Sequence, residues 1–214
     1  MARTMSVSQQ NRDRFIALSG SARAEMSSLD AYADLLVRWQ ARINLISSAT
    51  LEDLWERHFL DSAQLYAHIP PGAGALYDIG SGGGFPGLVL AVMSAARGGP
   101  AVSLIESDTR KATFLREASR ISGAGAQILD QRAESITAPP ADVVTARACA
   151  PLPRLLPWVH GRLKPGGTAL LLKGAQWRDE LTAAEKDWTM RVAEIPSLTD
   201  TSGVILKPEG LNPN

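Results

Sequence analysis

The stretch "YDIGSGGGFPG", from Tyr77 to Gly87, contains five glycines and one proline between two apolar segments. Glycine lacks a Cβ atom, so it adopts positive φ angles and lets another molecule approach the backbone closely. A tight turn alone requires one or two glycines. The composition of this stretch therefore favours a loop that lies against a bound ligand.

Short apolar runs and amphipathic stretches alternate on both sides of this loop. We expect strands at residues 75–80, 101–108, 126–131, 141–148, 168–174, 190–195 and 203–209, and helices at 87–96, 110–122, 152–163 and 176–188. Alternation of buried strands with helices is typical of a mostly parallel sheet covered on both faces. The sequence thus predicts a Rossmann-like α/β fold with seven strands, the last of them an antiparallel edge strand.

Residues 1–74 are predicted to form a helical extension, and residues 75–214 one compact core. One helical face is expected to carry the residues Leu29, Tyr32, Leu36, Trp39, Ile43 and Ile46. Ser27 and Thr50 each precede an acidic residue by three positions, which predicts them as helix caps.

The composition narrows the class of protein further. The 22 basic and 22 acidic residues give a net charge of zero, which argues against a protein that coats nucleic acid non-specifically. Cys149 is the single cysteine, so the chain forms no internal disulfide, and the three histidines lack ligand spacing, so we expect no metal. The first fifteen residues lack the apolar centre of a secretory signal, and no apolar run is long enough to span a bilayer. We expect a cytoplasmic protein without a membrane partner.

Three kinds of ligand use a glycine-rich loop between a strand and a helix. A phosphate loop ends in Gly-Lys-Ser/Thr, and no lysine occurs between residues 76 and 110. A dinucleotide-binding loop remains possible, because Gly82, Gly84 and Gly87 match G-x-G-x-x-G. An S-adenosylmethionine loop carries an acidic residue two positions before its first glycine, as Asp78 and Gly80 do here. The last two ligands both require an acid at the end of the second strand to hold the ribose hydroxyls, and Glu106 supplies it more convincingly than Asp108.

Two observations favour S-adenosylmethionine. The stretch "RLKPGG", residues 162–167, resembles the turn before a late strand in many class I methyltransferases. In addition, no histidine or Tyr–Lys pair stands where a hydride-transfer enzyme needs its acid or base.

The sequence resembles the RsmG (GidB) family of 16S ribosomal RNA methyltransferases from about Trp39 to Gly174. The resemblance rests on "NLISSATLEDLWERHFLDSAQL", "DIGSGGGFPGLVLA", "LIESDTRKATFLREA", "QRAE", "TARACAPLPRLL" and "LKPGG". The stretches His58–Ser62 and Gly84–Gly87 are more specific to the family than the loop alone.

The resemblance implies methylation of guanine N7 at a single guanosine (conventionally position 527) in the 530 loop of 16S rRNA. The substrate is expected to be 16S rRNA within a small ribosomal subunit or an assembly intermediate, and the enzyme a monomer. The implied cofactor contacts are Gly80 and Phe85 in the loop, Ala133 and Glu134 beside the adenine, and Arg147. Together with Asp78, Gly82, Gly84 and Glu106, these residues form the predicted cofactor site, and Arg147 is also the candidate catalytic residue.

The residues agree with this chemistry. Guanine N7 has an in-plane lone pair and no proton, so methyl transfer to it requires no general base. Methylation of an exocyclic amine would suit an Asp/Asn-Pro-Pro-aromatic motif, which "TARACAP" lacks. A nucleophilic Cys149 is conceivable, although a buried structural cysteine is the commoner state.

Other residues have more than one interpretation. Arg147 can bind the cofactor carboxylate, a substrate phosphate or a structural partner. His58 and Asp61 share a helix face, where they either pack the extension onto the sheet or act directly. Arg110, Lys111, Arg116 and Arg120 form a basic run that either meets RNA phosphates or is merely solvated. A methyltransferase with a non-RNA substrate and a nucleotide-binding module without turnover remain alternatives.

Overall fold

A computed structural model describes residues 7–214 of the chain. The first six residues of the predicted extension, and with them the start of the segment searched for a secretory signal, lie outside the described part. Among residues 7–214, no helix is both long enough and apolar enough to cross a membrane.

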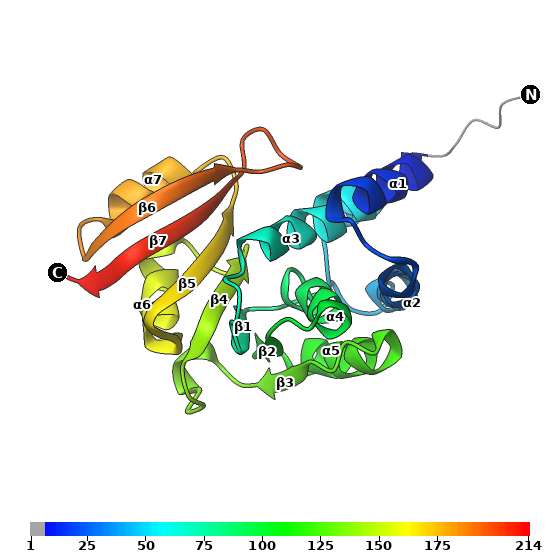
Figure 1. Ribbon diagram of the computed structural model, residues 1–214, viewed down its shortest axis with the longest axis horizontal. Helices are drawn as coiled ribbons and strands as arrows, with labels where there is room; N and C mark the ends of the chain where they lie inside the picture. The colour runs from blue at the N-terminus through cyan, green and yellow to red at the C-terminus, as the bar shows by residue number, and fades with distance from the viewer. Residues whose placement is uncertain (1–6) are drawn as a thin grey trace, which may run out of the picture.

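A mostly parallel sheet of seven strands forms the centre of the molecule (Figure 1). Its strands are β1 (Ala75–Ile79), β2 (Ala101–Glu106), β3 (Gln127–Asp130), β4 (Ala141–Arg147), β5 (Leu163–Lys173), β6 (Trp188–Pro196) and β7 (Val204–Pro213). They lie in the order β3-β2-β1-β4-β5-β7-β6, and strands β1 to β5 are parallel. The predicted fold class is confirmed.

The position of the last strand differs from the prediction. Strand β7 is antiparallel, as expected, but it lies inside the sheet between β5 and β6, and β6 forms the edge. The residues explain the order: Val204, Ile205 and Leu206 of β7 are buried, whereas most of β6 is half-buried or exposed. The more apolar strand takes the interior position because both of its faces are covered.

Helices cover both faces of the sheet (Figure 1). On one face lie α4 (Gly87–Arg97) and α5 (Thr109–Ser122), which share a hydrophobic cluster with the N-terminal helices. On the other face lie α6 (Leu152–Arg162) and α7 (Trp177–Ala184), which share a second cluster with the strands. The short helix η4 (Ala133–Ser135) also belongs to this second side.

The extension is helical, but its elements differ in detail from the prediction. They are α1 (Val7–Ser19), α2 (Arg23–Gln40), η1 (Ser48–Thr50), the π-helix η2 (Trp55–Leu60), α3 (Asp61–Ala63) and η3 (Gln64–His68). Helix α2 ends before Ile43 and Ile46, so these residues do not continue its apolar face. The Gln40 side chain stops the helix, because its carbonyl oxygen accepts hydrogen bonds from the amides of Leu45 and Ile46.

Both predicted helix caps are wrong. Ser27 lies inside α2, which begins at Arg23, where the carboxylate of Glu25 accepts a hydrogen bond from the amide of Ala22. Thr50 ends η1, and its hydroxyl bonds to the Ser47 carbonyl and to His58 rather than to a helix amide. At the start of α2, Glu25 makes the capping bond that was predicted for Ser27. The Thr50 hydroxyl is already bonded to His58 and to a carbonyl, so it does not cap a helix.

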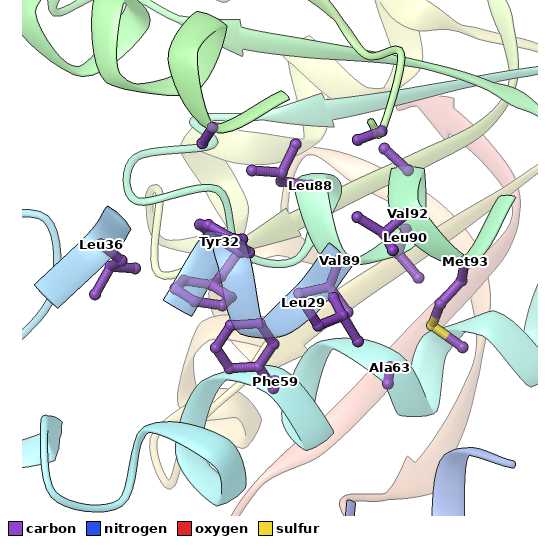
Figure 2. Packing of buried hydrophobic residues seen from close by; sticks show 14 of the residues in the cluster. Leu29, Tyr32, Leu36, Phe59, Ala63, Leu88, Val89, Leu90, Val92 and Met93 are labelled. Carbon is purple, nitrogen blue, oxygen red and sulfur yellow. The ribbon is translucent and has the colours of Figure 1, made fainter. Parts of the chain in front are cut away.

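Aromatic packing connects the extension to the loop. The Tyr32 ring lies 5.2 Å from the Phe59 ring and 5.4 Å from the Phe85 ring, and all three side chains are buried. Figure 2 shows Leu29 and Tyr32 of α2 together with Phe59 and with Leu88 and Val89 of α4. The Tyr32 hydroxyl donates a hydrogen bond to the carbonyl of Gly83. The extension therefore holds the glycine loop from behind.

Candidate active site

The glycine loop follows β1 at the point where β1 and β4 lie side by side. The chain leaves β1 toward β2 on one side, and β4 continues the sheet on the other. Ligands of such sheets bind at the carboxyl ends of the strands beside this division. The amides of Gly80 and Ser81 donate to the Ile105 carbonyl of β2, which fixes the start of the loop.

Gly82 and Gly84 show why the loop needs glycine. Both have positive φ angles, +54° and +95°. A Cβ atom on Gly84 would lie 2.5 Å from the Tyr32 hydroxyl, so packing excludes a side chain there. A Cβ atom on Gly82 would meet only the Gly80 carbonyl, at 3.8 Å, and would otherwise enter open space. The loop is thus both packed from behind and open in front.

A first cavity of about 420 Å³ opens in front of the loop, within the usual range for ligand pockets. Seven of the nine predicted cofactor residues lie on its wall: Gly80, Gly82, Phe85, Glu106, Ala133, Glu134 and Arg147. The other two are Asp78, which lies in β1, and Gly84, which lies in the loop. Both were predicted to bind the cofactor, but neither lies on the cavity wall.

Asp78 is fully buried, and its Oδ1 accepts a hydrogen bond of 2.7 Å from the hydroxyl of Thr145 in β4. Its Oδ2 makes no hydrogen bond within the described residues. Burial raises the pKa of this carboxyl group from 3.8 to about 6, even though the hydrogen bond from Thr145 acts in the opposite direction. Asp78 therefore connects two neighbouring strands beneath the loop.

Glu106 ends β2 and faces the first cavity. Its two carboxylate oxygens accept hydrogen bonds from the amides of Gly82 and Asp108, each at 2.8 Å. A carboxylate oxygen has a second lone pair, so each of these oxygens can accept a further bond from a ligand hydroxyl. The predicted ribose-binding role fits this position.

A second cavity of about 780 Å³ adjoins the first. Both cavities share the wall residues Leu45, Lys111, Arg147, Ala148 and Cys149. Within this wall Ala148 has a positive φ of +48°, a conformation that costs an alanine about 1 kcal/mol or more. Such strained residues concentrate at functional sites, and this one follows β4 directly between the two cavities.

Arg147 of this wall bonds to His58 and Asp61, which line the second cavity only, and this confirms that His58 and Asp61 share a face. Arg147 donates to Nδ1 of His58 at 2.8 Å and to Oδ2 of Asp61 at 3.1 Å. Its guanidinium carbon also lies 5.1 Å from the centre of the Phe85 ring. The two side chains of the extension therefore do more than pack against the sheet.

The structure argues against a nucleophilic Cys149. Burial and the nearby carboxylates of Asp78 and Glu106 raise the pKa of the thiol to about 11. Because the thiolate is the reactive form, the thiol is inert at neutral pH.

Several wall residues were not predicted. Leu45 reaches the cavities from the extension, whereas Arg154 and Trp158 of α6 line the first cavity, with the guanidinium 5.3 Å from the ring centre. Lys111, known from the sequence only as part of a basic run, lines both cavities. The rest of that run is engaged in part: Arg110 pairs with Asp108 and Arg116 with Asp130. No local pattern marks these wall residues, because only the folded chain brings them to the loop.

Solved structures with a similar fold include methyltransferases. A TehB-like SAM-dependent methyltransferase from Corynebacterium glutamicum superimposes with a TM-score of 0.56 and 17% identity over 83% of this chain and 96% of that chain. The mitomycin 7-O-methyltransferase MmcR gives a TM-score of 0.57 and 14% identity over 96% of this chain and 73% of that chain. The fold is that of the class I methyltransferases.

Sequence relatives define the protein more narrowly. The family model described as rRNA small subunit methyltransferase G matches residues 25–204, a wider range than the motifs noted above. The ribosomal RNA small subunit methyltransferase G of Rhodospirillum centenum is 53% identical over 199 residues, which cover 93% of this chain and 90% of the relative. Its counterpart in Paramagnetospirillum magneticum is 50% identical over 194 residues, covering 91% and 93%. The chain belongs to the rRNA small subunit methyltransferase G family.

Proposed function

We propose that this methyltransferase transfers a methyl group from S-adenosylmethionine to N7 of a single guanosine in the 530 loop of 16S rRNA. The observation that carries the proposal is the pair of adjoining cavities and the chemistry of their common wall. The ionisable groups on that wall are Arg147, Lys111 and Cys149. Two are cationic side chains and the third is a thiol whose pKa is raised to about 11, so the wall offers no general base. Guanine N7 is an acceptor that needs none, because it carries no proton.

The first cavity fits the cofactor. Glu106 offers two fixed carboxylate oxygens for ribose hydroxyls, Ala133 and Glu134 lie on the wall beyond it, and the front of Gly82 is open. S-adenosylmethionine supplies an electrophilic methyl group on a sulfonium centre. The residues of this chain bind and orient it, and Phe85 and Trp158 add apolar surface to a lining that is mainly polar.

The second cavity is the proposed place of the target nucleotide. Its lining includes four cationic side chains, Arg57, Lys111, Arg147 and Lys173. Three of them pair with carboxylates of the same lining, namely Asp200, Asp61 and Glu180, which leaves Lys111 as the cation best placed to meet a phosphate. An enzyme that modifies a base takes that base out of its stack into a pocket. The wall shared with the first cavity then lets the base approach the methyl group in line.

A matched pair of glycine variants tests the cofactor site. Gly82 has a φ of +54° and faces the first cavity, whereas Gly98 has a φ of +70° at the end of α4, with nothing within 4 Å of a Cβ atom. Both substitutions to aspartate introduce the same charge at a similar backbone angle. We expect Gly82→Asp to lose S-adenosylmethionine binding, measured by calorimetry, and Gly98→Asp to keep it.

The same preparations separate the alternatives. If Gly82→Asp keeps the cofactor affinity of Gly98→Asp, the assignment of the first cavity is wrong. If the native protein binds the cofactor but transfers no methyl group to small subunits that lack the modification, the protein is a binding module or acts on another substrate.

A further inference from the structure

Arg147 is held by the N-terminal extension rather than by its own sheet. Its Nη1 donates to the Arg57 carbonyl at 3.0 Å and to Asp61 Oδ2 at 3.1 Å, and its Nη2 donates to His58 Nδ1 at 2.8 Å. A guanidinium group has five N–H donors. The extension therefore takes three of them, and the remaining two, on Nε and Nη2, have no acceptor within the described residues.

The hydrogen bonds behind His58 determine its tautomer. Thr50 Oγ1 lies 2.8 Å from the Ser47 carbonyl, which only accepts, so the hydroxyl proton points there. Thr50 Oγ1 must then accept from His58 Nε2, 2.7 Å away. With its proton on Nε2, the ring presents a lone pair on Nδ1, which is the acceptor that Arg147 requires. Both ring nitrogens are thus engaged with the protein and neither is free for a substrate.

The surroundings keep this ring neutral. Burial, then the charges of Arg147 and Arg57, lower the pKa of His58 to about 3. The other charged groups nearby are Asp61 on the same helical segment, Asp200, which pairs with Arg57, and Lys111, which lines the second cavity with His58. Protonation would place an N–H on Nδ1 against the N–H of Arg147.

We propose that His58, supported by Thr50, positions Arg147 between the two cavities and aims its two remaining N–H donors at the reactants. His58 is a positioning residue: it acts on the reaction through Arg147. The role of the extension is then to fix one arginine of the core, in addition to covering the sheet. The activity part of this proposal rests on the proposed function, whereas the geometry can be tested on the unloaded protein.

Two isosteric variants separate positioning from simple packing. In His58→Asn the amide oxygen replaces Nδ1 and can still accept from Arg147, whereas in His58→Gln the amide takes the place of Nε2 and reaches Thr50 instead. Each variant loses one hydrogen bond, which costs about 1 kcal/mol, so both should melt at similar temperatures. We expect the kcat/KM of His58→Asn to stay within about threefold of the native value. The kcat/KM of His58→Gln should fall by on the order of 100-fold, because a small misplacement of an active group has an effect of this size.

Equal activities of the two variants, or losses that follow their melting temperatures, would mean that His58 only packs. Nitrogen-15 NMR of the unloaded protein provides an independent result. We expect an unprotonated Nδ1 and a protonated Nε2 at pH 6, and a higher His58 pKa in Arg147→Met. A doubly protonated His58 at pH 6 would overturn the positioning proposal even if the enzyme is active. If the native protein methylates no ribosomal substrate but the NMR result holds, only the proposed function fails.

Discussion

At the scale of single residues, the loop positions Gly84 and Gly82 require glycine for different physical reasons. Gly84 is required by packing, because its missing Cβ leaves room for the Tyr32 hydroxyl. Gly82 has no such neighbour, and its φ of +54° together with the open space in front of it points to a ligand. The two residues look identical in the sequence, so only the folded structure separates the turn requirement from the binding requirement.

Asp78 should make stability depend on pH. Its folded pKa of about 6 exceeds the ordinary value of 3.8, so the folded protein binds this proton more tightly than the unfolded chain does. The stabilising contribution is complete below pH 4 and is lost as the pH rises through 6. Asp78→Asn removes this dependence and keeps an oxygen for the Thr145 hydroxyl. Relative to the native protein, the variant should gain about 2 kcal/mol in free energy of unfolding between pH 4.5 and pH 7.5.

Urea unfolding at the two pH values measures this gain. Asp142→Asn is the control, because Lys164 and backbone amides lower the pKa of that half-buried carboxyl group, so its stabilising contribution is already present above the unfolded value of 3.8. The difference between this variant and the native protein should therefore stay nearly constant between the two pH values. A difference between Asp78→Asn and the native protein that is constant with pH would contradict the raised pKa.

The residues that the sequence placed on the cavity wall are those whose position follows from the strands. The loop follows β1, Glu106 ends β2 and Arg147 ends β4, and parallel strands end at one edge of a sheet. Lys111, Trp158 and Leu45 were missed as wall residues because their approach depends on how α5, α6 and the loop after α2 pack.

At the scale of elements, the extension and the core share an ion pair whose carboxylate is buried. Arg97 at the end of α4 donates from Nε to Glu25 Oε1 of α2 at 2.5 Å, and the Glu25 side chain is only 3% exposed. The Arg97 guanidinium also lies 5.0 Å from the centre of the Tyr66 ring. The pair joins segments that are 72 residues apart in the chain.

Replacing Arg97 should therefore cost more than a surface ion pair does. Arg97→Met leaves the Glu25 carboxylate buried without its cation, and because Arg97 is 28% exposed we expect a loss of about 2 kcal/mol in the free energy of unfolding. Denaturant unfolding measures it.

The double variant Arg97→Met/Glu25→Gln should recover part of that loss, since it removes the unpaired charge. An Arg97→Met protein as stable as the native one would show that the pair contributes nothing to the attachment of the extension.

The sequence predicted which elements exist better than where they end. Seven strands and the helices between them follow from alternating apolar runs, because burial repeats along each element. The end of α2 and the interior place of β7 depended on the Gln40 side chain and on the contrast in burial between β6 and β7, which periodicity does not register. The boundary between extension and core at residues 74 and 75 stays a prediction, since one hydrophobic cluster contains residues from both sides of it.

At the scale of the whole molecule, the net charge of zero bears on the substrate. Affinity for RNA as a polyanion comes mainly from cationic side chains that neutralise phosphates. For a neutral protein with few unpaired cations near its cavities, binding should also depend on the shape of the folded substrate. We therefore expect faster methylation of the small subunit or an assembly intermediate than of protein-free 16S rRNA, in a comparison of initial rates. Equal rates on the two substrates would contradict this expectation.

The central claim is that two adjoining cavities bring a sulfonium methyl group to a guanine N7 without a general base. Its most direct test is transfer from labelled S-adenosylmethionine to small subunits that lack the modification, followed by borohydride and aniline treatment, which cleaves RNA at N7-methylguanosine. We predict a single cleavage in the 530 loop of 16S rRNA. Incorporation of label without cleavage there, or cleavage at another guanosine, would contradict the account.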